Sequence, residues 1–186
     1  MDVIDSMMQE HDVIYRFVAV IRTACCHILE GEPLCTEDFH NMTRFAREYA
    51  DRYHHGKEEK ILFREMTKRL GPAAEKVIRN GMLVEHDLGR LHINELEQAL
   101  QNYEQTPSTE NKLAVITHAC GWAALLQRHM DKENAVVYMF ARRELPADVL
   151  ESISEETKAF DASQEHKKEA QSSLSLLEEL ASKYNI

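Results

Sequence analysis

Residues 54–59 read HHGKEE and residues 129–134 read HMDKEN. In each stretch the first residue is a histidine, and the fifth is a glutamate that follows a lysine. Residues four positions apart share one face of an α-helix, so each stretch places an imidazole beside a carboxylate. One such pair is common on protein surfaces, but two pairs with matching sequence indicate a shared site. The pairs are His54–Glu58 and His129–Glu133.

Hydrophobic residues recur at three- and four-residue steps through most of the chain, which is the pattern of amphipathic helices. Glycines, prolines and one polar segment interrupt this pattern. The breaks fall at residues 31–33, 71–72, 104–109 and 145–146. The intervening segments predict four long helices and two further ones, over residues 3–28, 36–70, 73–103, 110–143, 147–160 and 163–183.

Four long helices joined by short connections predict an all-α fold, namely an up-down-up-down four-helix bundle. We expect residues 1–145 to form this bundle and residues 146–186 to form a C-terminal helical extension packed on it. A stripe of leucines in the extension suits either a cap on the bundle or a contact in a homodimer. A monomer and a homodimer therefore both stay open. The stripe consists of Leu174, Leu176, Leu177 and Leu180.

The composition excludes several classes of protein. The chain has 186 residues and a net charge of −10, from 22 Lys and Arg against 32 Asp and Glu. This length predicts one domain with its own core, and a hydrophobic content of 44% excludes a disordered chain. The acidic balance argues against nucleic acid or an anionic membrane as a partner. The sequence also lacks a run of about 18 apolar residues, the length that spans a bilayer.

The N-terminal segment and the cysteines indicate the compartment. The first residues are acidic where an export signal is basic, so we expect no such signal. The cysteines form no CxxC pair, which fits neither a disulfide framework nor a thiolate zinc site. Reduced thiols are typical of the cytoplasm, and we expect a cytoplasmic protein. The cysteines are Cys25, Cys26, Cys35 and Cys120.

The first and third predicted helices each add one histidine to the two His–Glu pairs. His11 and His86 both lie in a Glu-His-Asp context, and His11 belongs to an apolar stripe. Bundle cores lined by imidazoles and carboxylates hold carboxylate-bridged pairs of metal ions. Such mixed ligands suit iron first, and then manganese or zinc. The predicted ligands are His11, His54, Glu58, His86, His129 and Glu133.

The histidine doublet leaves two assignments for the second helix, because His55–Glu59 has the same spacing as His54–Glu58. At 3.6 residues per turn, His54 lies about a quarter turn from the centre of the apolar stripe, and His55 about half a turn. The matching stretch on the fourth helix also favours His54 and Glu58. We therefore expect His55 and Glu59 at the edge of the site, supporting the ligands or facing solvent.

Three strings resemble the motifs of the hemerythrin-like HHE cation-binding family: HHGKEEKILF, VEHDLGRLH and RHMDKENAVVYMF. The resemblance covers about residues 1–145, and the tail resembles a helical extension that some members carry. It implies a four-helix bundle around two non-haem iron ions bridged by oxide or hydroxide, for which zinc or manganese can substitute. The six predicted ligands occupy the ligand positions of the family.

The chain departs from the oxygen-carrying hemerythrins at several positions. Those proteins have a second histidine four residues after the third-helix histidine, where this chain has Arg90. Their last carboxylate is an aspartate five residues after its histidine, whereas Glu133 follows after four. Many members also carry proline where this chain has Arg64 and Met139. The missing imidazole leaves one iron short of protein nitrogen, which favours an open coordination position over reversible oxygen carriage.

Two classes of function follow from the resemblance. The first is a di-iron protein that binds or senses O2 or NO. The alternative is a di-iron enzyme that reduces peroxide or NO, or that donates iron for iron–sulfur cluster repair. Either class implies a small-molecule ligand (O2, NO or peroxide) and an electron donor that the sequence does not identify. Storage of metal is a third reading, which a capacity of two ions limits.

Other polar residues are predicted to have structural roles. His118 shares the inward face of His129 and is expected to be a hydrogen-bonded core residue, whereas His92 lies off the face of His86. Lys57 and Lys132 precede the two glutamates and are expected to be solvated.

Overall fold

The computed structural model describes residues 2–186, and all regular secondary structure in that range is helical. The first half contains α1 (Val3–Leu29), α2 (Thr36–Phe45), η1 (Ala46–His55), η2 (Glu58–Leu62) and α3 (Phe63–Arg69). The second half contains α4 (Gly71–Val77), η3 (Ile78–Met82), α5 (Leu83–Gln105), α6 (Thr109–Lys132), η4 (Glu133–Val137) and α7 (Tyr138–Glu144). The chain then continues into α8 (Ala147–Ala162) and α9 (Gln164–Tyr184).

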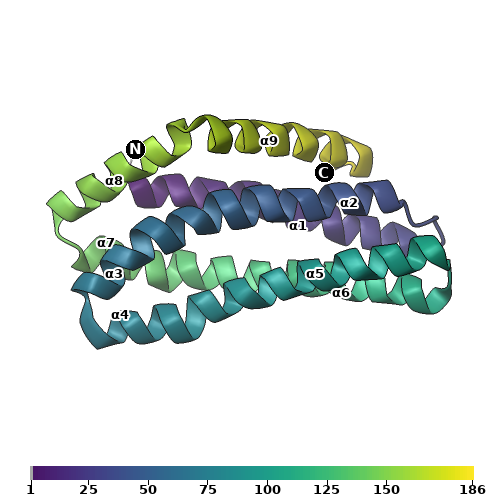
Figure 1. Cartoon of the computed structure of the whole chain (residues 1–186), viewed down its shortest axis with the longest axis horizontal. Helices are drawn as coiled ribbons and strands as arrows, with labels where there is room; N and C mark the ends of the chain where they lie inside the picture. The colour runs from purple at the N-terminus through teal and green to yellow at the C-terminus, as the bar shows by residue number, and fades with distance from the viewer. Residues whose placement is uncertain (1) are drawn as a thin grey trace.

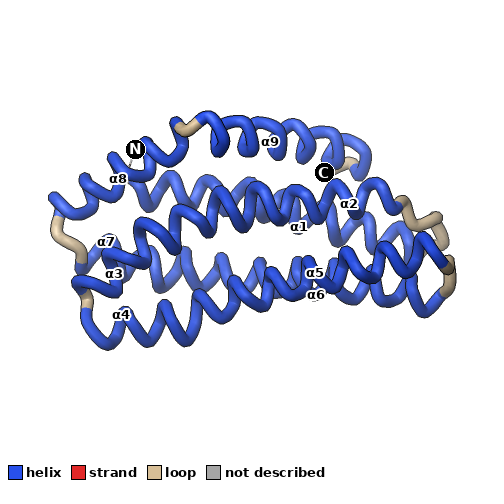
Figure 2. The backbone as a smooth tube through the Cα atoms, viewed as in Figure 1, coloured by secondary structure: helices blue, strands red, loops and turns tan. Residues whose placement is uncertain are grey.

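These elements join into four long rods that run up, down, up and down (Figure 1). The first rod is α1, and the second runs from α2 through η1 and η2 to α3. The third runs from α4 to α5, and the fourth from α6 to α7. The tube view shows only short loops between the rods (Figure 2). The predicted all-α bundle is confirmed.

Local chemistry explains where the rods begin and end. The carboxylate of Asp2 accepts a hydrogen bond from the backbone N–H of Ile4, and the hydroxyl of Ser108 accepts one from Asn111. Such caps satisfy backbone groups at a helix start that have no partner within the helix. Gly31 and Gly71 have φ of 106° and 70°, a region that glycine adopts without steric cost. These glycines allow the sharp turns after the first two rods.

The segments η1 to η4 are π-helical, and three of them contain or adjoin the His–Glu motifs. A π-helix closes its hydrogen bonds from residue i to i+5, so its turn is wider than that of an α-helix. Side-chain directions therefore shift relative to a wheel of 3.6 residues per turn. In η1, which ends at His55, this shift affects both histidines of the doublet.

The apolar core consists of two clusters with the polar motifs between them. One cluster is built mainly from α1, α2, α5, α6 and α9, and it includes Phe17, Phe45 and Trp122. The other is built from the start of α1 and from α3, α4, α7 and α8, and it includes Phe63 and Tyr138. The bundle therefore carries a polar layer between two hydrophobic halves.

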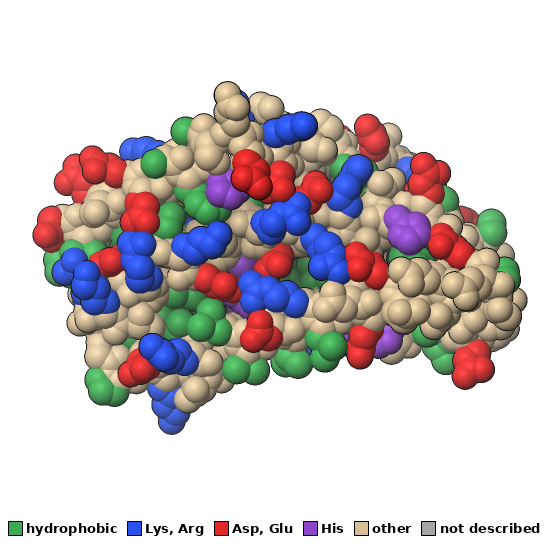
Figure 3. Space-filling view, viewed as in Figure 1, with side chains coloured by type: hydrophobic (Ala, Val, Ile, Leu, Met, Phe, Trp, Pro, Cys, Tyr) green, Lys and Arg blue, Asp and Glu red, His purple; other side chains and the backbone are tan. Residues whose placement is uncertain are grey.

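The helices α8 and α9 turn back along α1 and α2 (Figure 1). Leu176, Leu177 and Leu180 of α9 are buried in the first core cluster, whereas Leu174 is 40% exposed. On the face shown in Figure 3, acidic and basic side chains are interleaved along the middle of the molecule. Within residues 2–186, no helix combines the length and apolar character needed to cross a membrane.

Candidate metal centre

The structure brings all six predicted ligands together in the polar layer. They come from all four rods, and each is at most 1% exposed. Burying this many imidazoles and carboxylates is costly unless the groups are compensated. Their role as metal ligands stays a prediction, but their convergence is a property of the fold. The six are His11, His54, Glu58, His86, His129 and Glu133.

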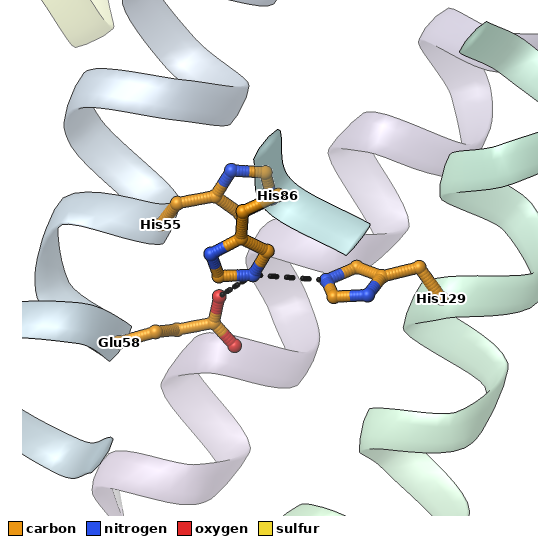
Figure 4. A group of neighbouring side chains, drawn as sticks. All are labelled: His55, Glu58, His86 and His129. Atoms are coloured by element: carbon orange, nitrogen blue, oxygen red, sulfur yellow. Dashed lines mark hydrogen bonds and ion pairs between the residues drawn. The ribbon is translucent and has the colours of Figure 1, made fainter. Parts of the chain in front are cut away.

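The buried residues form two groups that share Glu58. Within each group, the atoms that could bind a metal ion all lie within 4.8 Å of one another. We call them the α1 group and the α5 group, after the rods that contribute His11 and His86. The α1 group consists of His11, His54, Glu58 and Glu133. The α5 group consists of His55, Glu58, His86 and His129 (Figure 4).

Two carboxylates connect the groups. Oε2 of Glu58 lies 3.7 Å from Nε2 of His54 and 3.5 Å from Nε2 of His86. Oε2 of Glu133 lies 3.4 Å from Nε2 of His11 and 3.2 Å from Nε2 of His129. Each glutamate thus reaches one imidazole of either group, which is the placement required of a carboxylate that bridges two metal ions.

The prediction that His55 lies at the edge of the site was wrong. His55 is 4% exposed, and neither of its ring nitrogens has a hydrogen-bond partner. Its ring stacks on that of His86 with centroids 3.8 Å apart (Figure 4). The π-helical turn of η1 directs both members of the doublet inward. The α5 group therefore has three imidazoles, so it is not short of nitrogen although Arg90 stands where a second third-helix histidine was expected.

Outer hydrogen bonds orient four of the imidazoles. In each of them Nδ1 lies 2.7–2.9 Å from an oxygen of a neighbouring side chain. Because these oxygens accept, Nδ1 carries a proton and Nε2 of each ring points into the site. The pairs are His11–Asn134, His54–Glu10, His86–Glu59 and His129–Glu85.

The lysines of the two motifs bind these outer carboxylates. Lys57 pairs with Glu10, and Lys132 pairs with Glu85. The expectation that both are solvated was wrong for Lys57, which is fully buried, whereas the side chain of Lys132 is 48% exposed. The lysine of each motif therefore binds an outer glutamate. That glutamate in turn orients the histidine three residues before the lysine.

This arrangement repeats after 75 residues along the chain. Each outer acid, ligand histidine, lysine and glutamate of the first half has a counterpart in the second. The equivalent positions are 10 and 85, 11 and 86, 54 and 129, 57 and 132, 58 and 133, and 59 and 134. Three of the site positions break the symmetry, and the first is the outer acid Glu59, whose counterpart is the amide Asn134. His55 corresponds to Met130, and Tyr138 corresponds to Phe63.

Tyr138 is a site residue that the sequence analysis missed. Its ring stacks on His11 with centroids 5.3 Å apart, and its hydroxyl donates to Oε1 of Glu58 at 2.5 Å. The same hydroxyl lies 3.3 Å from Nε2 of His11. The available signal was its position five residues after Glu133 on the same rod.

Arg90 occupies the position of the missing histidine and binds two acids around the α5 group. It donates to Glu59 at 2.7 Å and to Asp51 at 2.9 Å. Glu59 accepts from His86, and Asp51 lies 3.5 Å from Nδ1 of His55. Burial disfavours the charge of Glu59, but hydrogen bonds from His86 and Arg90 outweigh it and lower the pKa to about 2. Arg90 thus supports the imidazoles from outside.

The central carboxylates differ in charge. Burial and the neighbouring charge of Glu133 raise the pKa of Glu58 well above its ordinary value. Burial acts the same way on Glu133, but the surrounding histidines outweigh it and hold its pKa well below the usual range. Burial lowers the pKa of His86, yet the nearby carboxylate of Glu133, the hydrogen bond to Glu59 and the charge of Glu58 raise it to about 10 overall. These shifts favour the protonated forms of Glu58 and His86, and a bound cation would displace the protons.

A small cavity lies beside the α5 group. Its lining includes His55, His86 and Trp122, together with the small residues Ala50 and Gly89. About 20 Å3 is available to the centre of a water-sized molecule, which suffices for one water. Most of the accessible lining surface is apolar, although Arg47, Asp51 and Arg90 also line the cavity, which has room for one small molecule next to the imidazoles.

The comparisons with known proteins agree with this geometry. The family model described as Hemerythrin HHE cation binding domain matches residues 2–141, which include every residue of both groups. Comparisons with curated proteins and with solved structures gave no match. The chain therefore belongs to the hemerythrin HHE cation-binding domain family.

Proposed function

We propose that this protein binds two iron ions in the α1 and α5 groups and uses them to bind or sense O2 or NO. The observation that carries the proposal is a set of buried nitrogen and oxygen atoms that could bind a metal ion and that have no hydrogen-bond partner. They are Nε2 of His54, both ring nitrogens of His55, Oε2 of Glu58 and both carboxylate oxygens of Glu133. Buried polar atoms are nearly always paired, so unpaired atoms that converge from several helices fit a cation site.

The donor set favours a transition metal. Five imidazoles and two carboxylates suit iron, manganese or zinc and are too rich in nitrogen for magnesium or calcium. Bound iron would supply one-electron chemistry and open positions for a diatomic ligand. The protein itself orients the Nε2 atoms through outer hydrogen bonds and surrounds them with apolar side chains that exclude water.

One observation favours the alternative, an enzyme that reduces peroxide or NO. The hydroxyl of Tyr138 lies against both Glu58 and His11, inside the buried site. Reduction of peroxide to water consumes protons, and this hydroxyl is placed to deliver one. Burial raises the pKa of Tyr138 well above its ordinary value, so the phenol keeps its proton at neutral pH until the reaction draws on it.

Two measurements test the proposal. Purified protein should contain close to two iron ions per chain, and less than one transition-metal ion per chain would contradict the common premise. The reduced protein is then mixed with O2, NO or H2O2 in a stopped-flow spectrometer. A stable, reversible adduct with O2 or NO supports binding or sensing. Rapid turnover of peroxide or NO supports the enzyme, and no reaction with any of them supports storage.

A further inference from the structure

Three potential ligands converge on the outside of the bundle, apart from the centre described above. His92 and Glu95 lie one turn apart on α5, and His118 faces them from α6. Their donor atoms lie within 4.8 Å of one another, and Nδ1 of His118 is 3.0 Å from Oε2 of Glu95. The expectation of a core role for His118 was wrong, because its side chain is 25% exposed.

Gly121 of α6 fixes the position of the His92 ring. A Cβ atom at position 121 would lie 2.7 Å from Cε1 and 3.0 Å from Nδ1 of His92, so no other residue leaves room for the ring. Glycine inside a helix costs about 1 kcal/mol relative to alanine. The close packing of the imidazole against α6 explains why glycine stands there, and it holds the ring beside His118.

Two ring nitrogens at this place have no hydrogen-bond partner. Nδ1 of His92 and Nδ1 of His118 are both buried atoms without a hydrogen bond, and the nearest carboxylate oxygen to Nδ1 of His118 is Oε2 of Glu95 at 3.0 Å. Burial and the proximity of His118 also lower the pKa of His92, which keeps its ring in the neutral form that binds metals. The carboxylate of Glu95 is exposed and supplies the negative charge.

We propose that His92, Glu95 and His118 bind a divalent transition-metal ion such as zinc. Two imidazoles and one carboxylate are a common ligand set for these ions, and water completes the coordination at a partly exposed site. None of the three residues belongs to the α1 or α5 group. His92 is six residues beyond His86, which is about 9 Å along the helix axis. A bound ion would join α5 to α6.

The test uses full-length, iron-loaded protein with Zn2+ as the probe. After equilibrium dialysis against micromolar Zn2+, iron and zinc are counted together by mass spectrometry. We expect one zinc per chain in addition to the iron. His118→Ala and His92→Ala should each weaken zinc binding by at least about tenfold, because losing even a supporting residue of a metal site costs about 10–100-fold. Gly121→Ala should weaken it as well, by displacing His92.

His40→Ala is the matched control, because His40 is an exposed histidine that pairs with Glu104 on other parts of the bundle. It should leave zinc binding unchanged, and circular dichroism confirms that all variants are folded. Absence of the additional zinc in the wild type would overturn the inference. So would unchanged zinc binding in both His118→Ala and His92→Ala. His54→Ala should remove iron from the α1 group and keep this zinc, so failure of the central proposal and failure of this one are distinguishable.

Discussion

Glu58 belongs to both ligand groups, whereas His55 belongs to one. Glu58→Ala should therefore reduce the metal content to less than one ion per chain. His55→Leu removes one imidazole from the α5 group alone and should leave about one tightly bound ion. Metal content of purified, dialysed variants gives the answer, with the exposed Glu75→Ala of α4 as the control that keeps two ions. A His55→Leu protein that retains both ions would show that His55 is not a ligand.

Protons compete with metal ions at the same atoms. In protein stripped of metal, His86 is protonated at neutral pH because its pKa is raised to about 10, and the raised pKa of Glu58 favours the protonated carboxyl group. Metal binding must release these protons, so the metal-free state binds more protons and metal affinity rises with pH. Calorimetric titration in two buffers of different ionisation enthalpy measures the release. Equal heats in both buffers would mean that no proton leaves.

Four of the six converging residues could be picked out from the sequence because an i, i+4 pair needs only a helix to meet, and His11 and His86 could be picked out from their shared Glu-His-Asp context. His55 could not be placed, because the wheel of 3.6 residues per turn does not describe the π-helical turn of η1. Two facts together pointed to it: Arg90 stands where an imidazole was expected, and a second histidine adjoins His54. Tyr138 was missed because a tyrosine on an apolar stripe does not differ from a packing residue.

At the scale of the helices, Gly89 of α5 lines the small cavity beside His55 and His86. A Cβ atom at Gly89 would contact Leu126 at 3.6 Å and Trp122 at 3.8 Å, which is ordinary van der Waals contact. Gly89→Ala should therefore fold, narrow the cavity beside His86 and slow the association of NO or O2 severalfold. Rapid-mixing kinetics on the reduced protein measure this rate, and the single Trp122 in the cavity wall serves as a fluorescent reporter.

Gly81→Ala is the control for that experiment, since a Cβ atom there meets nothing within 4 Å. Both substitutions remove a glycine from a helix and should stabilise the protein by up to about 1 kcal/mol. Only the change at position 89 should alter the association rate. Equal rates in the two variants would mean that ligands enter by another route.

The extension reaches the site through one side chain of α8. Asp161 accepts from Nζ of Lys57 at 2.9 Å, and Lys57 also binds Glu10, which orients His54. Asp161→Asn should lower the free energy of unfolding by about 1–3 kcal/mol, because a buried charge loses a charged partner. Urea denaturation measures the difference. Glu156→Gln removes an exposed α8 ion pair with Arg64 and should cost less than about 1 kcal/mol.

Across the whole molecule, the polar layer separates two hydrophobic clusters. Because bound cations would compensate this layer, their removal by a chelator should lower the melting temperature by about 10 °C or more. Differential scanning calorimetry with and without added Fe2+ checks this expectation. Hydrogen exchange should speed up in η1, η2 and η4, which contain His54, His55, Glu58 and Glu133. A melting temperature that does not respond to metal would show that the layer is stable by itself.

The number, approximate length and order of the four rods could be predicted, because hydrophobic periodicity and the breaks at Gly31, Gly71, residues 104–109 and Pro146 determine them. The position of α8 and α9 could not. An amphipathic stripe such as that of Leu176 and Leu180 requires a partner surface without specifying which one. The contact between Lys57 and Asp161 depends on that choice, so it could not be predicted either.

The 75-residue repeat also determines how the two halves of the chain depend on each other. Glu10 orients His54 within the first half, and Glu85 orients His129 within the second. The other two histidines are oriented by a residue of the opposite half: His11 by Asn134, and His86 by Glu59. Each half therefore contains one histidine whose orienting side chain is supplied by the other half. The two halves depend on each other for these hydrogen bonds, so we expect neither half alone to orient all four histidines.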